Sequence, residues 1–481
     1  MAEQKDELYA YDAEYRDTIA TVDQRGKRIW VYPKRPSGKY HRLRIGVSVF
    51  LLTLFFAGPF IRVGGQPFLL INIFDRHFIL FGQVFWPQDF FLLALTLITF
   101  FIFVILFTVS FGRLWCGWAC PQTLFMEMVF RKIEYWIEGD APAQRRLAAA
   151  PWNAEKILRK GGKQLVFLII SLLIAHVAMA YLIGIGEVRE IVTRPPSAHM
   201  SGFIGLLAFT AIFYGVFAYF REQACVAVCP YGRLQGVLLT KDSLAVAYDW
   251  IRGEPRGKIR RQQENQETAT TGDCIDCKLC VHVCPTGIDI RNGTQLECVN
   301  CSACIDACDE VMVKTGKPTG LIRIDSYNAL RDGVKRIMNP RTVGYSVVLT
   351  LLIGLLGYLI FTRSEIETTV LKAPGTLYST DDNGQITNIY NLEFVNKTFR
   401  DILLDVRILE PATATLEKIG QDAAVVRKES MLKAMYIVRI PPSDLREVKT
   451  RVVFAISEGD RRIETVSARF VGPIGRFKTT P

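Results

Sequence analysis

The chain contains five long runs of apolar residues, separated by polar and charged segments. The runs cover residues 45–61, 90–111, 164–186, 201–220 and 342–362, and none of them contains a charged residue. A helix that crosses a bilayer needs about 20 such residues, with a lower limit of about 17. The first run is the shortest and has Pro59 near its end. The pattern predicts five transmembrane helices.

Lysine and arginine are unevenly distributed among the segments that connect these runs. Residues 1–44 contain ten, residues 112–163 contain nine and residues 221–341 contain seventeen, whereas residues 62–89 and 187–200 contain two each. Positive charge stays on the cytoplasmic side because moving it across the membrane is unfavourable. We therefore expect the three basic segments to be cytoplasmic. Residues 363–481 then lie outside, in the periplasm of a bacterium, and their 18 basic residues agree with this because long exported domains escape the rule.

The composition fits a membrane protein with soluble parts. The 481 residues suffice for about three domains, and with 50% hydrophobic and 22% charged residues the chain is not disordered. The net charge of +11 does not indicate nucleic-acid binding, because the basic residues are sorted by membrane side. We expect a cytoplasmic segment 1–44, four spans in 45–222, a cytoplasmic domain 223–341, a fifth span 342–362 and a periplasmic domain 363–481.

Eight of the twelve cysteines form two copies of the spacing C-x2-C-x2-C-x3-C. This is the run of bacterial ferredoxins, in which three cysteines bind one [4Fe–4S] cluster and the fourth binds the other. Pro285 follows the first copy and predicts a turn there, whereas Asp309 follows the second. The expected ligands of one cluster are Cys274, Cys277, Cys280 and Cys308, and those of the other are Cys298, Cys301, Cys304 and Cys284.

Other uses of these eight cysteines fit the spacing less well. Zinc ribbons separate their cysteine pairs by longer loops, and disulfides are rare on the reducing cytoplasmic side. Two neighbouring clusters form a relay for single electrons. Nothing in this segment predicts a substrate pocket, so other residues must supply the donor and acceptor sites.

The remaining four cysteines form two C-x3-C-P motifs, just after the second and fourth apolar runs. The motifs are Cys116, Cys120 and Pro121, and Cys225, Cys229 and Pro230. Residues i and i+4 share one face of a helix, so each pair can present two sulfurs together, and the proline ends or turns the helix. If the two spans pack together, four thiolates meet at the membrane edge, where they favour Cu(I), Zn or an iron–sulfur centre. Buried structural cysteines are the alternative, but the repetition favours a redox or metal role and suggests two related halves.

The histidines argue against a haem protein. A membrane b-type haem usually has two axial histidines, and only His176 lies within an apolar run, so a multi-haem core is excluded. We expect His176 to pack or to form a hydrogen bond. The other four histidines are His41, His77, His199 and His282.

The C-terminal part, residues 363–481, contains neither cysteine nor histidine. Alternating segments such as 403–408 and 451–456 predict strands, and turn residues occur at 382–384 and 458–460. About 119 residues with several strands fit an immunoglobulin-like β-sandwich. Such a domain more often binds a partner than carries out chemistry.

With these features the sequence resembles the CcoG (FixG, RdxA) family of cytochrome c oxidase accessory proteins over nearly its whole length. Asp309 departs from generic ferredoxins, but it agrees with this family. Besides the paired ferredoxin motif, the resemblance is carried by residues 26–34 (GKRIWVYPK), 115–122 (WCGWACPQ), 229–233 (CPYGR), 388–391 (NIYN) and 395–397 (VNK).

The resemblance implies a role in the assembly of cbb3-type cytochrome c oxidase, with Cu(II) reduced before copper delivery. In that interpretation the clusters supply electrons to copper held by the soft thiolates of Cys116, Cys120, Cys225 and Cys229, which then retain Cu(I). It also implies copper-handling proteins and oxidase assembly factors as partners, in the bacterial inner membrane.

Two other functions fit part of the sequence. Membrane ferredoxin subunits of the quinol dehydrogenase type have four spans, C-x3-C-P pairs and two clusters, and pass electrons to a periplasmic reductase. The fifth span and the outer domain argue against this function. A non-enzymatic scaffold would hold oxidase subunits through residues 363–481.

Overall fold

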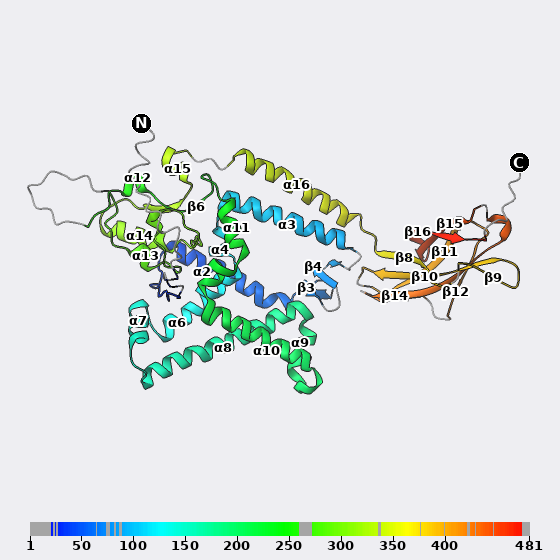
Figure 1. The fold of residues 1–481 in the computed structure, drawn as a ribbon, viewed down its shortest axis with the longest axis horizontal. Coiled ribbons are helices and arrows are strands. Elements are labelled where there is room, and N and C mark those ends of the chain that lie inside the picture. Colours follow the sequence, from blue (N-terminus) through cyan, green and yellow to red (C-terminus); the bar gives the residue numbers. More distant parts are fainter. Residues whose placement is uncertain are drawn as a thin grey trace, which may run out of the picture. The chain divides into compact units, whose positions relative to one another are not determined.

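The computed structural model describes residues 21–22, 25, 27–63, 65–73, 77–80, 83–85, 89–258, 272–334, 338–375, 377–398, 400–420, 424–428, 430–445 and 447–473 (Figure 1). The predicted N-terminal segment is therefore described only from Thr21, and Gly26 lies outside the described residues. The chain divides into two compact units, one of Met1–Pro59 and Thr96–Ile353, the other of Phe60–Leu95 and Gly354–Pro481.

Five helices among the described residues are long and apolar enough to cross a membrane, as the sequence predicted. The third begins at Ala154 rather than at residue 164, because Asn153 caps it by accepting a hydrogen bond from the Lys156 amide at 2.8 Å. Its first turns are charged, so the helix extends beyond the apolar run. The five are α2 (Lys39–Ala57) with the turn η2 (Gly58–Phe60), α3 (Phe90–Phe111), α8 (Ala154–Ile183), α10 (Met200–Gly215) with the turn η6 (Val216–Phe220), and α16 (Pro340–Phe361).

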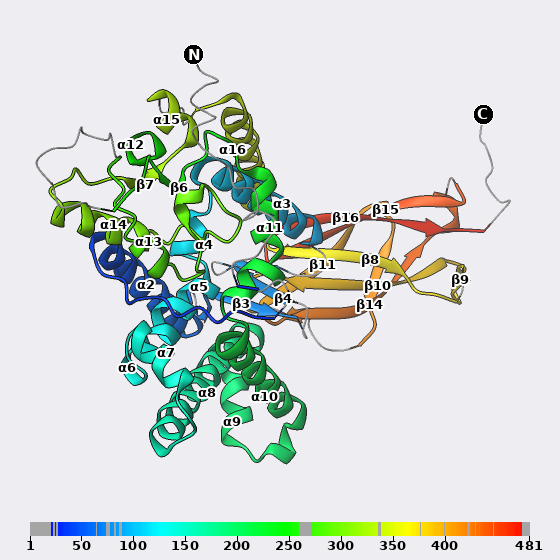
Figure 2. The ribbon, with the colours of Figure 1, turned by 60° about the vertical axis from the view of Figure 1, so that its left-hand side comes forward.

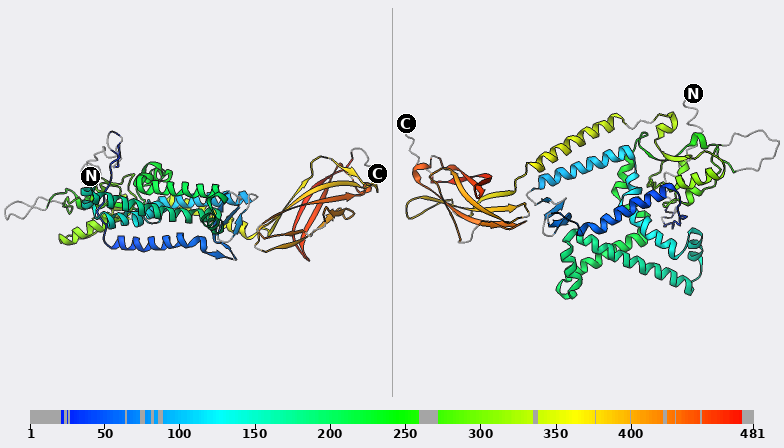
Figure 3. Two further views of the ribbon diagram at one scale, coloured as in Figure 1. Left: turned by 90° about the horizontal axis from the view of Figure 1, so that it is seen from below. Right: turned by 180° about the vertical axis from the view of Figure 1, so that it is seen from behind.

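Aromatic side chains form the core of the helical part of the first unit. Helices α8 and α10 lie side by side (Figure 3), and Phe130 stacks on Phe217 with its ring centroid 4.5 Å away and meets Phe167 edge-on at 4.8 Å. The shorter helices are α4 (Leu114–Trp118), α5 (Pro121–Phe125), η4 (Met126–Phe130), α6 (Arg131–Ile137), α7 (Ala141–Ala149), α9 (Ile185–Thr193), η5 (Pro196–Ala198), η7 (Ala224–Val228) and α11 (Pro230–Leu238).

The predicted cluster domain also belongs to the first unit. Its two strands, β6 (Ala245–Tyr248) and β7 (Ile322–Asp325), pair antiparallel and pack with α13 and α14 (Figure 2). The ends of the domain are thus joined, which closes the segment that carries the eight cysteines. Its helices are α12 (Trp250–Gly253), α13 (Leu279–His282), η8 (Ile290–Asn292), α14 (Ala303–Lys314) and α15 (Tyr327–Asp332).

The second unit contains the predicted immunoglobulin-like sandwich. One sheet has the order β12-β14-β10-β8, with β9 paired to β10, and the other has the order β13-β11-β15-β16. Alternate residues of both sheets meet in one apolar core, which includes Phe394, Phe454 and Phe470. The strands are β8 (Ile366–Lys372), β9 (Ser379–Thr380), β10 (Ile386–Asn396), β11 (Ile402–Glu410), β12 (Thr415–Lys418), β13 (Ala424–Val426), β14 (Met431–Ile440), β15 (Lys449–Glu458) and β16 (Arg461–Val471), with the turn η9 (Pro442–Asp444).

The loop between the first two spans folds with this sandwich in the second unit. Buried Asp89 forms ion pairs with Arg363 and with Lys397, the latter at 2.6 Å. Lys397 is also paired with Glu367 at 2.6 Å. The loop contains the short strands β1 (Arg62–Val63), β2 (Gln66–Pro67), β3 (Leu69–Asn72), β4 (His77–Leu80) and β5 (Gln83–Phe85).

Candidate functional site: two cluster cavities and a thiol site

Two cavities in the cluster domain are lined by cysteines. Each cavity contains the four cysteines that the sequence groups as one ligand set, and Cys280 lines both, while the exchange of fourth ligands stays a prediction. One cavity is lined by Cys274, Cys277, Cys280 and Cys308. The other is lined by Cys284, Cys298, Cys301 and Cys304, together with Cys280.

The electrostatic surroundings of the fourth cysteines support the same grouping. Burial, together with the neighbouring Cys280 and Cys274, raises the pKa of the Cys308 thiol to about 12. Burial likewise raises the pKa of Cys298 to about 12; the Asn300 backbone lowers it, and Cys284 raises it. Each fourth cysteine therefore lies beside the three cysteines of the other run.

The fourth cysteine lies outside a helix in the first run and within a helix in the second. Helix α13 is only four residues long and ends before Pro285, so Cys284 lies beyond the helix. Helix α14 continues through Cys308 and Asp309 to Lys314, because no proline interrupts it. The turn of generic ferredoxins is therefore absent after Cys308, which lies one helical turn beyond Cys304.

Backbone geometry tests whether these cavities fit iron–sulfur clusters. Four non-glycine residues have positive φ at equivalent places, 52° and 56° at Asp276 and Lys278, and 53° and 63° at Asn300 and Ser302. Such left-handed residues between right-handed ones turn successive backbone N–H groups inward, which forms the concave anion site found around many clusters. The conformation is unfavourable for these side chains, so its occurrence in both runs fits a negatively charged group in each cavity.

The two C-x3-C-P motifs share a local structure that differs from the predicted continuous helix. Cys120 and Cys229 are extended, with ψ of 125° and 115°, because a residue before proline avoids the helical region. The prolines are the first residues of α5 and α11. Each second cysteine donates its N–H to the residue before the first cysteine, Cys120 to Trp115 at 2.9 Å and Cys229 to Ala224 at 2.8 Å. A break between two helices, rather than one helical face, therefore brings each pair together.

The two pairs come together at one place, which we call the thiol site (Cys116, Cys120, Cys225 and Cys229). The pKa of Cys116 is raised to about 11, mainly by burial and also by Cys120 and Cys229, while a hydrogen bond from Gln235 opposes the rise. Burial also raises the pKa of Cys225, and the other three thiols contribute. A metal that binds Cys116 and Cys225 must therefore displace their protons.

Gln235 was not identified from the sequence. Its side chain is fully buried, and Nε2 donates a hydrogen bond to the Cys116 sulfur at 3.2 Å. Gln235 lies only a few positions after the second motif, and its hydrogen bond reaches a cysteine of the first motif. It therefore links the segments that carry the two cysteine pairs.

The thiol site lies directly against the second cluster run. A Cβ atom on Gly117 would lie against the carbonyl oxygens of Val299 and Asn300, 2.7 Å from the latter. Trp118 Nε1 donates a hydrogen bond to the Asn300 carbonyl at 3.2 Å. The backbone between Cys116 and Cys120 therefore touches the backbone between Cys298 and Cys301.

One buried guanidinium connects the same three segments. Arg113 donates hydrogen bonds to the carbonyl oxygen of Leu296 and, at 2.9 Å, to that of Gly232. Leu296 lies two residues before the first cysteine of the second cluster run, and Gly232 lies three residues after Cys229. Arg113 was not identified as a site residue from the sequence, although a charged residue directly after an apolar run can indicate a functional site at the membrane edge.

A buried network of charges fixes the end of the fourth span. Arg221 has a positive φ of 53° and forms a bidentate ion pair with Glu134, with N–O distances of 3.0 and 2.6 Å. Lys163 of α8 pairs with Glu134 at 3.3 Å, and Arg28 pairs with Glu222 at 2.8 Å. The network thus ties the segment that leads into Cys225 to α6, α8 and the N-terminal segment.

The spacing of side chains in the described part of the chain bears on the binding of a single metal ion. No three histidine, cysteine or carboxylate side chains in it come close enough to bind one metal ion. Each thiolate of a [4Fe–4S] cluster would bind a different iron atom rather than one shared ion, so the cluster cavities agree with this result. The predicted packing role of His176 fits its ring, whose Nδ1 forms a hydrogen bond with the Leu172 carbonyl at 2.7 Å.

Comparisons with known proteins agree with this architecture. A 4Fe-4S dicluster domain matches residues 220–327, and a 4Fe-4S binding domain matches residues 93–139. The family described as "IG-like fold at C-terminal of FixG, putative oxidoreductase" matches residues 356–473.

Similar proteins extend over most of the chain. Protein RdxB of Cereibacter sphaeroides is 35% identical over 86% of this chain and 89% of its own length. Protein RdxA of the same organism is 36% identical over 92% and 97%. The nitrogen fixation protein FixG of Rhizobium meliloti is 32% identical over 84% of each chain. The chain belongs to the FixG/RdxA family.

Family membership and the matched domains establish the general nature of this FixG/RdxA protein. It is a multi-pass membrane protein that carries two iron–sulfur clusters and transfers electrons. A crystal structure of a FixG-related protein from Vibrio parahaemolyticus covers 23% of this chain at 20% identity, with a TM-score of 0.20, and supports no further conclusion.

Proposed function

We propose that this protein reduces Cu(II) at the thiol site, in the assembly of cbb3-type cytochrome c oxidase. The observation that carries the proposal is the backbone contact between Gly117 and the second cluster run, which leaves no side chain between the two sites. When bound, the clusters supply single electrons, and each substrate Cu(II) needs one electron to become Cu(I).

The residues of this chain have distinct parts in this function. Cys274, Cys277, Cys280 and Cys308 would hold one cluster, and Cys298, Cys301, Cys304 and Cys284 the other. Arg113 and Gly117 hold the second cluster run against the thiol site. Gln235 orients the Cys116 sulfur, and soft thiolates retain the product Cu(I).

The proposal extends to location and partners. The basic residues favour a cytoplasmic cluster domain and a periplasmic sandwich in the bacterial inner membrane. Copper-handling proteins and oxidase assembly factors are the proposed partners, and the sandwich is the part suited to bind them. An electron donor outside this chain supplies the electrons.

A second candidate for the thiol site is a third iron–sulfur cluster. The 4Fe-4S binding domain matched at residues 93–139 contains Cys116 and Cys120. The absence of a tight three-ligand group among the described residues also fits a cluster better than one copper ion. In this case the cluster at the thiol site would be the last electron carrier before copper.

The test compares purified full-length protein with the double variants Cys116→Ser/Cys120→Ser and Cys225→Ser/Cys229→Ser. Chemically reduced protein is mixed with Cu(II), and Cu(I) is measured with a colorimetric chelator. Both variants should lose Cu(II) reduction, whereas His176→Ala should retain it. Wild-type rates in both double variants would place the reaction elsewhere.

Iron analysis of the same samples separates the two candidates. With two four-iron clusters the wild type contains about eight iron atoms per chain, and the double variants keep all of them. A third cluster would give about twelve in the wild type and about eight in the variants.

A further inference from the structure

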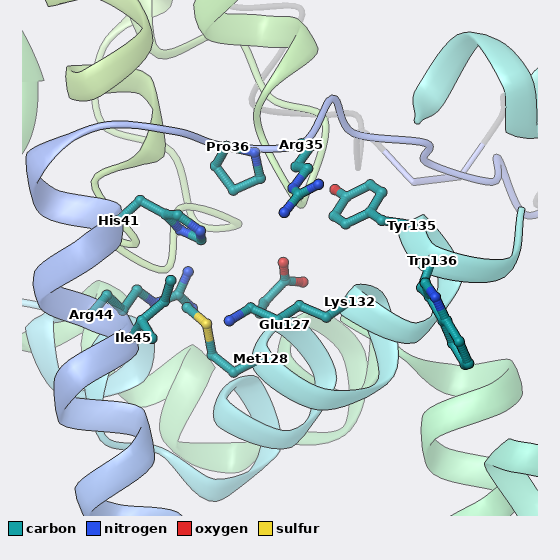
Figure 4. A pocket seen from close by; sticks show the side chains of 10 residues that line it. All are labelled: Arg35, Pro36, His41, Arg44, Ile45, Glu127, Met128, Lys132, Tyr135 and Trp136. Atoms are coloured by element: carbon teal, nitrogen blue, oxygen red, sulfur yellow. The ribbon is translucent and has the colours of Figure 1, made fainter. Parts of the chain in front are cut away.

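A cavity with an excess of positive charge lies between the start of α2 and the helix formed by η4 and α6. Its volume is about 360 Å³. Arg35, Arg44 and Lys132 line it, together with His41 and one carboxylate, Glu127 (Figure 4). We call it the basic pocket. None of its lining residues lines a cluster cavity or belongs to the thiol site.

The single carboxylate does not neutralise these cations. Glu127 already pairs with Arg131, whose Nε lies 3.1 Å from its oxygen. Within the part of the chain that the structure describes, the side chains of Arg35 and Lys132 form no ion pair. Burial lowers the pKa of Lys132, and the charges of Arg35 and Arg44 lower it further, so the three cations face one another.

Arg44 gives an independent sign that a ligand belongs in the pocket. Its side chain is 4% exposed, and Nε donates a hydrogen bond to the Gly117 carbonyl at 2.6 Å. Its Nη2 is buried and has no hydrogen-bond partner among the described residues. A buried guanidinium nitrogen without an acceptor is costly, and an anion in the pocket would supply one.

The position of the pocket indicates which anion it takes. Arg44 and His41 lie in the first turns of α2, at the predicted cytoplasmic end of the first span. Trp136 lies at the rim of the pocket and is 81% exposed (Figure 4). Tryptophan prefers the level of the lipid headgroups, and basic pockets beside spans on this side bind anionic lipids. An uncharged lipid would leave the positive charges of Arg35, Arg44 and Lys132 without a counter-charge.

We propose that the basic pocket binds the phosphodiester group of an anionic phospholipid, such as phosphatidylglycerol. Arg35, Arg44 and Lys132 contact the phosphate, and Trp136 packs beside the lipid. Arg44, which would contact the lipid phosphate, also donates a hydrogen bond to the carbonyl of Gly117, between Cys116 and Cys120 of the thiol site. The proposal is independent of the function proposed above.

The test titrates delipidated full-length protein in neutral detergent with phosphatidylglycerol or phosphatidylcholine, and counts bound lipids by native mass spectrometry. One phosphatidylglycerol should bind more tightly than any phosphatidylcholine. Arg35→Gln/Lys132→Gln should weaken its binding about 25-fold, since each basic residue near a headgroup contributes about fivefold. The iron content of the variant shows that it is folded.

Arg42→Gln is the matched control, because Arg42 is an exposed residue of α2 that does not line the pocket. It should bind phosphatidylglycerol like the wild type. Equal weakening in both variants would mean general attraction of charge to the membrane and would overturn the proposal. Equal binding of both lipids, or displacement of phosphatidylglycerol by millimolar inorganic phosphate, would also overturn it.

Discussion

Gly117 shows how a single backbone position controls the contact between the electron relay and the thiol site. The carbonyl oxygens of Val299 and Asn300 occupy the space that a Cβ atom would need. Because both neighbours are backbone atoms, they cannot rotate away as a side chain could. The whole second cluster run would have to shift.

We expect Gly117→Ala to separate the two sites while both clusters are still bound. The steric overlap should lower stability by about 1–3 kcal/mol and slow Cu(II) reduction by roughly tenfold or more. Gly161→Ala is the control, since a Cβ there meets nothing within 4 Å. Absorbance of the reduced and oxidised clusters monitors their presence. An unchanged rate of reduction would contradict the role of this contact.

Cys284 tests the exchange of cluster ligands. It lines the cavity of Cys298, Cys301 and Cys304, so Cys284→Ser should damage that cluster and leave the other. Electron paramagnetic resonance of the reduced protein should then show one cluster signal instead of two interacting ones. Selective loss of the cluster of Cys274, Cys277 and Cys280 would show that each run binds its cluster without exchange.

Among single residues, the sequence identifies the candidate ligand cysteines better than the residues that surround them in the fold. Ligand spacing is local, so the spacing alone identifies the eight ferredoxin cysteines and the four thiols. It does not identify Arg113 and Gln235, because their partners are far away in the sequence and only the packed helices bring them together.

At the scale of elements, hydropathy locates the spans but not their ends. The charged start of α8 is helical because Asn153 caps it, and hydropathy is insensitive to caps. The proline motifs show a similar limit. Their i, i+4 spacing predicted two sulfurs on one helical face, whereas the prolines begin new helices and leave Cys120 and Cys229 in the break.

The ion pairs of Asp89 join the loop 60–95 to the sandwich within the second unit. Asp89→Asn would remove one of the two ion pairs of buried Lys397, which keeps its pair with Glu367, and would also remove the pair with Arg363. We expect a loss of about 3 kcal/mol, measured as a lower unfolding temperature in calorimetry.

Asp405→Asn serves as the control for this prediction. Asp405 also pairs with an arginine, Arg407, at 2.7 Å, but their side chains are 45% and 75% exposed. Its removal should change stability by less than about 1 kcal/mol. Equal effects of the two substitutions would show that the Asp89 pairs do not hold the loop.

For the whole molecule, an odd number of spans predicts that the two termini lie on opposite sides of the membrane. The second unit agrees with this arrangement, because it combines the loop after the first span with the domain after the fifth. Only the charge distribution indicates which side is cytoplasmic. The order of the domains along the chain could therefore be predicted from the sequence. The ion pairs of Asp89 that join the loop to the sandwich could not, because no sequence pattern reveals them.

Reporter fusions test the sidedness. A fusion at Gly293 should be active with a cytoplasmic reporter such as green fluorescent protein, and one at Gly472 with a periplasmic reporter such as alkaline phosphatase. If the same reporter were active at both positions, residues 342–362 would not cross the membrane.

The helix that carries Cys304 and Cys308 also caps the first span. Asp306, between these two cysteines, accepts hydrogen bonds from the backbone amides of Tyr40 and His41 at 3.0 and 2.7 Å. In the ligand sets that the sequence predicts, each cluster takes one cysteine from this helix, so we expect that without iron the first span loses the acceptor of its terminal amides. A cell short of iron should therefore degrade this protein rather than accumulate an inactive form, and the protein's abundance would report on cluster supply.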